Sequence, residues 1–252
     1  MGVTQLHDVV CIVCVGSSTI LRFNAATHRR LTDIDVKDLR HPHDIVACER
    51  TSQLYVADDP ACVWRVSADG ADIKLRWSQS SSDTFIPWSL SVTSTRLLVT
   101  SYSTNQLMQL VSDGDELRRV QLPDYMGPHH AVEIASGSFI VSHYNTHLKP
   151  EHQISEVNTA GEVLRQFSGS RLSSSLGRTP HVAVDSHGNI FLADFDNDRI
   201  LLLDAQLRLR RVFIDDHQLK NKPPWRLCYR EQTGQLLVGL LNSVAVFDVL
   251  RR

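Results

Sequence analysis

The sequence predicts an all-β fold, on the evidence of a repeat, its strand pattern and its junctions. A strand-turn-strand unit recurs six times at about forty-residue spacing, and 252 residues divided by six give about 42 per unit. The clearest copy runs from Thr179 to Ala205. A unit of this size needs its neighbours to form a core. Because each unit is made of strands alone, we expect a radial array: a six-bladed β-propeller.

The second strand of each unit is the most regular element. Each copy is a four-residue apolar run, typical of a strand buried on both faces between neighbouring blades. The six runs cover residues 10–13, 54–57, 97–100, 139–142, 190–193 and 236–239. A polar turn and a third strand follow each run, as in 63–66 or 200–203. Five units add an alternating outer strand, such as 116–120 or 208–212, and the sixth does not.

The junction before most units carries a Pro followed by a ring. These pairs place the blade starts near residues 1, 43, 88, 129, 181 and 225, and the first unit lacks the Pro. We expect equivalent positions at the blade entrances for these rings: His43, Trp88, His129, His181 and Trp225, with Met1 nearest in the first unit.

Composition favours one soluble domain over residues 1–252, located in the cytoplasm. The formal net charge of −2 excludes a field of one sign over the whole surface, such as nucleic acid or an anionic membrane attracts. Five cysteines follow no disulfide or zinc spacing. No secretory signal precedes the first unit, and no apolar run is long enough to span a bilayer. A domain cut from a longer chain would have the same features.

The Thr179–Ala205 copy resembles the NHL repeat. The matching positions are the apolar Val182–Val184, Gly188 in the turn, Ile190–Asp194 in the second strand, and Asn197, Arg199 and Ile200 after it. The unit beginning at Pro42 keeps Ala57 and Asp58 but not the Asn and Arg. The resemblance implies a six-bladed propeller. NHL domains at the C-terminus of tripartite-motif ubiquitin ligases bind RNA or protein without catalysis.

Residues Pro42–Val66 also resemble a blade of the peptide-amidating lyases. In those zinc enzymes a Pro-His pair begins alternate blades, so that three imidazoles meet on the axis. Here the histidines fall on blades two, four and five, and blade six has Trp225 instead. This departure argues against a regular three-histidine zinc site.

The blade entrances and the loops between second and third strands share one face of a propeller. The sequence therefore places ligand-binding residues on that face: His43, Trp88, His129, His181, Trp225, Tyr102 and Asn145. Wide rings serve as stacking platforms, or fill space where blades meet. Imidazoles near neutral pH bind zinc or nickel. A divalent ion, if bound, would use His129, His130, His143 and His181.

No nucleophile elbow, phosphate-binding glycine loop or H-E-x-x-H helix is present in the sequence. We therefore expect a scaffold without a cofactor that recognises a protein or RNA on the loop face. The alternative is a metal-dependent lyase or hydrolase that uses the axial histidines. The unpartnered strand at 244–249 is a template for strand addition by another chain or for self-association. The sequence leaves the ligand and the oligomeric state open.

Overall fold

The computed structural model describes residues 1–59, 61–80, 83–93, 95–101, 103–111, 115–147, 151–169, 172, 174–179 and 181–249. It is all-β, with six small antiparallel sheets that form a six-bladed β-propeller, as predicted. The chain divides into two compact units, residues 1–119 and 120–252. The prediction of one domain over 1–252 stays a prediction.

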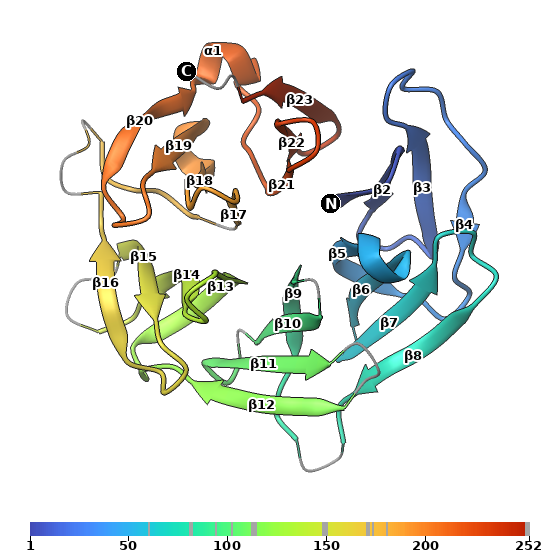
Figure 1. Cartoon of the computed structure of the whole chain (residues 1–252), viewed down its shortest axis with the longest axis horizontal. Coiled ribbons are helices and arrows are strands. Elements are labelled where there is room, and N and C mark those ends of the chain that lie inside the picture. Colours follow the sequence, from blue (N-terminus) through green and yellow to red (C-terminus); the bar gives the residue numbers. More distant parts are fainter. Residues whose placement is uncertain are drawn as a thin grey trace. The chain divides into compact units, whose positions relative to one another are not determined.

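The first unit holds three sheets, in which strands lie side by side in chain order (Figure 1). Their strands are β1 (Gly2–Leu6), β2 (Val9–Val13), β3 (Thr19–Asn24) and β4 (Ile34–Asp35); β5 (His41–Cys48), β6 (Gln53–Asp59), β7 (Cys62–Ser67) and β8 (Ile73–Ser78); β9 (Pro87–Val92), β10 (Arg96–Ser101), β11 (Gln106–Val111) and β12 (Glu116–Gln121). The boundary between the units falls inside β12.

The second unit holds the other three sheets. Their strands are β13 (Met126–Glu133), β14 (Phe139–Asn145), β15 (Glu151–Val157) and β16 (Val163–Phe167); β17 (Val182–Val184), β18 (Ile190–Asp194), β19 (Arg199–Leu203) and β20 (Leu209–Ile214); β21 (Arg226–Arg230), β22 (Gln235–Gly239) and β23 (Val244–Asp248). A short α-helix, α1 (Asp216–Leu219), joins the last two sheets and begins with a capping box at Asp215. In the described part of the chain the last sheet has three strands, which confirms the predicted short blade.

The cores lie between neighbouring sheets of each unit. The second strands β6, β10, β14, β18 and β22 supply buried side chains on both faces, because the strand is covered by a sheet on either side. Phe191 and Val238, for example, share one cluster with Leu219 of α1. Every first strand begins within three residues of its predicted start. No helix among the described residues has the length and apolar character needed to cross a membrane.

Candidate functional site

A β-bulge interrupts the start of three first strands. The register shifts between Pro42 and Asp44 and between Pro128 and His130. In the third sheet Ser101 pairs with Pro87 and Thr100 with Ser89, so Trp88 is skipped. The extra residue of such a bulge is unpaired and its side chain is turned away from the ladder. His43, Trp88 and His129 are these extra residues.

The predicted alignment of the junction rings is therefore wrong by one residue in most sheets. The residues that stand at one register position, opposite the same place on the second strand, are Gly2, Asp44, Ser89, His130, His181 and Arg226. Only His181 was placed correctly. In its sheet the Pro-His pair comes one residue later relative to the apolar strand, so aligning the prolines gives the wrong register.

Burial separates the two sets of residues. Asp44, Ser89, His130, His181 and Arg226, which we call the register set, are all between 0% and 6% exposed. The neighbouring rings of His43, Trp88, His129 and Trp225 are half-buried. The rings are therefore the accessible residues, whereas the register set belongs to the interior.

Hydrogen bonds explain what the register set does. In the first unit Asp44 Oδ2 accepts the backbone N–H of Leu90 at 2.9 Å. In the second unit the Nδ1 atoms of His130 and His181 accept the N–H groups of Val182 and Leu227, at 3.3 and 3.4 Å. Leu90, Val182 and Leu227 occupy the same place in the third, fifth and sixth sheets. One polar side chain thus ties the first strand of a sheet to the first strand of the next.

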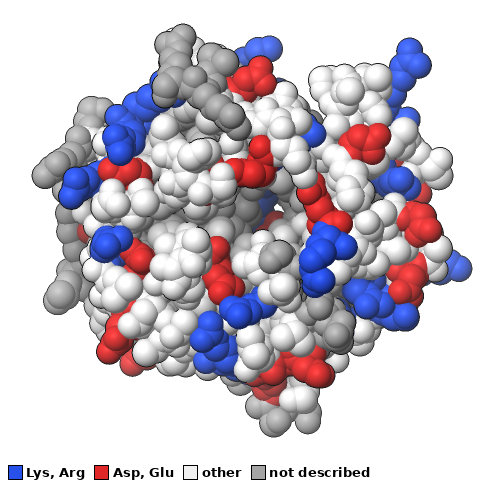
Figure 2. Space-filling view, viewed as in Figure 1, with Lys and Arg blue, Asp and Glu red and all other residues white. Residues whose placement is uncertain are grey.

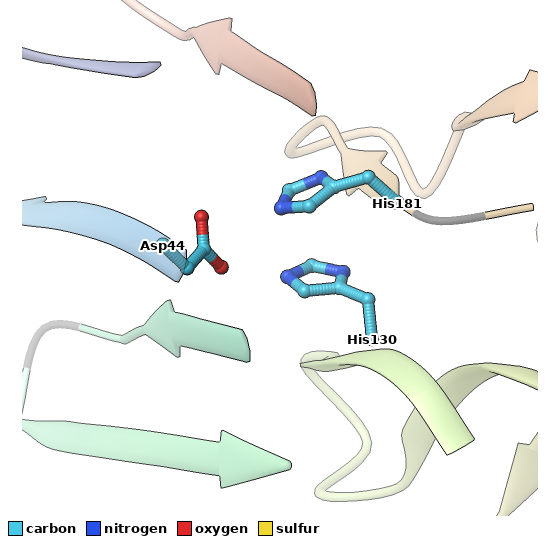
Figure 3. Close-up of side chains that lie close together, drawn as sticks. All are labelled: Asp44, His130 and His181. Carbon is cyan, nitrogen blue, oxygen red and sulfur yellow. The ribbon is translucent and has the colours of Figure 1, made fainter. Parts of the chain in front are cut away.

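The rings of His130 and His181 stack with their centroids 3.5 Å apart (Figure 3). Because each Nδ1 accepts a backbone N–H, the neutral ring carries its proton on Nε2. Burial lowers the pKa of His181 well below its usual value, and His130 and Arg226 lower it further. The His181 ring is therefore neutral at pH 7. Figure 3 also draws Asp44, which belongs to the first unit.

Two of the residues named for a divalent ion, His130 and His181, use Nδ1 to accept backbone N–H groups. A metal on Nε2 of His130 or His181 would move the proton to Nδ1, where it would face a backbone N–H. His143 Nε2 lies 2.8 Å from Ser155 Oγ. Within either unit, no three His, Cys, Asp or Glu among the described residues come close enough to share an ion.

Half-buried rings of three successive sheets in the second unit come from strands β13, β14 and β15 and from the residues beside β18 and β21. The ring of His152 lies 5.6 Å from that of His129 and 5.0 Å from that of Tyr144. Phe195 packs edge-on against Trp225 at 5.0 Å, and the guanidinium of Arg178 lies 4.4 Å above the Phe195 ring. We call these six residues the aromatic surface: His129, Tyr144, His152, Arg178, Phe195 and Trp225.

The aromatic surface has almost no net charge at pH 7. Burial, then His152, Arg226 and Arg178, lowers the pKa of His129 to about 4. Burial also lowers the pKa of His152, so both imidazoles are neutral. The Arg178 guanidinium pairs with Asp196 at 2.9 Å. The surface thus offers flat rings rather than a positive field.

The first unit contributes a separate pair. The ring of His43 lies 4.8 Å from that of Trp88, tilted by 31°. Tyr102 lies outside the described residues. Asn145 Nδ2 donates to Gln153, and its Oδ1 accepts the N–H of His147, so this side chain holds its own turn.

The motif residues of the NHL-like copy are structural. The buried Asp194 accepts Arg199 Nε at 2.6 Å, Asn197 Nδ2 at 2.8 Å and the Gly177 N–H at 2.9 Å. Asp58, at the same place in the second sheet, accepts the N–H groups of Arg40 and His41. Both carboxylates lie at the end of a second strand and hold the backbone of the segment that leads into the first strand of the same sheet.

Sequence reasoning missed Phe195 as a site residue. Tyr102, Tyr144 and Phe195 all follow the second strand by two residues. An aromatic residue at the same position in three units was a visible signal, and aligning the second strands would have found it.

No protein-family model and no curated protein matches the sequence. Solved structures share its fold. A catalytically inactive variant of virginiamycin B lyase from Staphylococcus aureus, with quinupristin, is 13% identical with a TM-score of 0.71, covering 99% of this chain and 80% of that chain. A chain of a nidogen/laminin complex is 15% identical with a TM-score of 0.67, covering 86% and 81%. The β-propeller domain of Cps50 (Swd1) from Myceliophteria thermophila is 9% identical with a TM-score of 0.63, covering 99% and 83%.

These neighbours include a lyase and a chain of a protein complex, and identities this low show the fold alone. The resemblance to NHL repeats stays a prediction.

Proposed function

We propose that this chain is a non-catalytic recognition module that binds a protein through the aromatic surface. The observation that carries the proposal is that the buried and the half-buried residues at the junctions have different roles. The buried polar side chains bind backbone N–H groups, whereas the half-buried rings beside them leave part of their faces accessible. The six residues of the aromatic surface include no Ser, Cys, Lys, Asp or Glu, so no nucleophile and no carboxylate pair is arranged among them.

The composition of the aromatic surface supports a protein partner. Tyr, Trp and Arg are the residues most enriched among those that carry protein–protein binding energy. Tyr144, Trp225 and Arg178 belong to that class, and each is held in place by a neighbouring ring or carboxylate. Such preorganisation lowers the entropy lost on binding.

Charge argues for protein over RNA. RNA affinity depends on phosphate contacts by unpaired Lys and Arg. On the face shown in Figure 2, basic and acidic side chains are interspersed outside the grey residues, with no single basic patch. Arg178, the cation of the aromatic surface, is paired with Asp196. Propellers of similar fold in a nidogen/laminin complex are consistent with a protein partner.

The proposal is tested by comparing Trp225→Ala with a core change in the neighbouring strand, Leu237→Ala. Once a partner has been identified by cross-linking, Trp225→Ala should weaken binding by about 1–3 kcal/mol. Its unfolding free energy should fall by less than the ~2–5 kcal/mol expected for Leu237→Ala, which opens a buried cavity. If Trp225→Ala loses stability like a core change and keeps full affinity, the ring only fills space.

Metal analysis of the purified protein tests the alternative, a metal-dependent lyase or hydrolase that uses the histidines. We expect less than stoichiometric zinc, nickel or other transition metal. One equivalent that is lost in both His130→Asn and His181→Asn would overturn the non-catalytic assignment.

A further inference from the structure

The last sheet has an open edge. In the described part of the chain, β23 pairs with β22 along five residue pairs, and no strand pairs with its other side. The other five sheets each carry a fourth strand at this place. The backbone groups on the free side of β23 therefore form an unused hydrogen-bonding row.

The hairpin geometry shows which groups make up that row. The Leu240 N–H donates to Ser243 and the Val249 N–H to Gly234, so these pairs are hydrogen-bonded. Because such pairs alternate along an antiparallel ladder, Ala245 and Phe247 face β22. Val244, Val246 and Asp248 point their N–H and C=O groups away from it. None of these outward groups has a partner among the described residues.

The edge also lacks the features that protect sheet edges from pairing. The outer strands β8, β16 and β20 each have a register shift, and each carries at least one Lys or Arg. Strand β23 pairs without a shift and has no Lys, Arg or Pro. Val246, at the centre of the row, is 41% exposed. Edges of this kind accept another strand.

The fourth strands of the other sheets indicate what kind of strand fits. In three of these sheets the residue opposite the position of Val246 is basic: Lys74 in β8, Arg165 in β16 and Arg211 in β20. Asp248 occupies the place of Asp204, which Arg210 of β20 approaches at 3.4 Å. Asp248 is exposed and is the one charge on β23.

We infer that β23 binds an extended peptide segment of a protein partner in which apolar residues alternate with arginine. The segment runs antiparallel to β23 and completes the sheet, with its backbone on Val244, Val246 and Asp248. An arginine of the segment pairs with the Asp248 carboxylate, as Arg210 does with Asp204. This site is separate from the aromatic surface and does not depend on it.

The test uses a fluorescein-labelled peptide with the sequence of residues 207–214, LRLRRVFI, as an outer-strand probe. Fluorescence anisotropy against the whole chain should show saturable binding. A control peptide with Glu in place of every Arg should bind at least about tenfold more weakly, because it repels Asp248. Equal binding of both peptides would overturn the pairing of an arginine of the segment with Asp248.

Two variants at one position test the backbone pairing. Val246→Pro removes an outward N–H without removing a bond to β22, and should weaken the probe at least about tenfold. The matched Val246→Thr keeps the N–H and should stay within about threefold. Unchanged binding by Val246→Pro, with a wild-type circular dichroism spectrum, overturns the proposal.

Hydrogen exchange gives a second readout that does not depend on a variant folding. Saturating probe should slow exchange of the Val244, Val246 and Asp248 amides at least about tenfold, and leave Ala245 and Phe247 unchanged. Protection elsewhere instead would overturn the site. A wild-type dimer in sedimentation that Val246→Pro dissociates would make a second copy of the chain the occupant, and would overturn the peptide assignment.

Discussion

Burial of His143 should make the protein steeply sensitive to acid. Its ring is fully buried, and Nε2 is 2.8 Å from Ser155 Oγ. Burial first, and then the nearby His129, lowers its pKa to about 3, against an ordinary value of about 6.5. Between these values the unfolded ring binds a proton that the folded ring does not. The stability that depends on the neutral ring is therefore complete above about pH 6.5 and is lost as pH falls.

The magnitude follows from linkage. One proton bound only by the unfolded state costs about 1.4 kcal/mol of unfolding free energy for each pH unit. Between about pH 6.5 and about pH 4.5, His143 alone therefore accounts for a loss of roughly 2.5 kcal/mol. The non-titrating His143→Gln should lose about that much less than wild type over the same range. His129 and His181 add to the slope in both proteins, because burial also lowers their pKa values.

Urea unfolding followed by tryptophan fluorescence, at several pH values in that range, measures the effect. Ser155→Ala is the control, since it removes the hydroxyl partner and keeps the imidazole. It should be less stable by about 1–3 kcal/mol at every pH, with the steep acid slope retained. Parallel pH profiles for wild type and His143→Gln would refute the reasoning.

Two further predictions concern positions where the structure leaves no room for change. Asp194→Ala should lower the unfolding free energy by about 3–5 kcal/mol in urea titrations, because the guanidinium of Arg199 stays largely buried without its carboxylate. A loss below about 1 kcal/mol would contradict this prediction. Gly161→Ala should cost at least about 2 kcal/mol, because its φ is +86° and a Cβ would lie 2.0 Å from the carbonyl oxygen of Gln121. Gly137→Ala, at a φ of +82° with open space around it, is the matched control and should melt clearly higher.

The strands could be predicted because their signal is local. A run such as Ile190–Ala193 is apolar at four successive places, and a strand covered on both sides requires this.

The strand register at the junctions could not be predicted from the sequence in the same way. A bulge adds one residue to a strand without changing its composition, so neither proline nor hydrophobic pattern marks it. His129 and His130 are adjacent residues of the same type. His129 is half-buried beside His152, whereas His130 is buried against the His181 ring. Which histidine faces a ligand is decided by register, a property of the paired strands.

Site-specific photo-cross-linking tests the central claim, protein recognition by the aromatic surface, most directly. The probe amino acid p-benzoylphenylalanine is placed at Tyr144 or Phe195 in the surface. The control positions are Ser136 and Thr233, in the turns between the first and second strands of the fourth and last sheets, at the strand ends far from Tyr144 and Trp225. We predict a discrete protein adduct from Tyr144 and Phe195, reduced by Trp225→Ala, and none from Ser136 or Thr233. Adducts with RNA, or equal adducts from all four positions, would contradict the account.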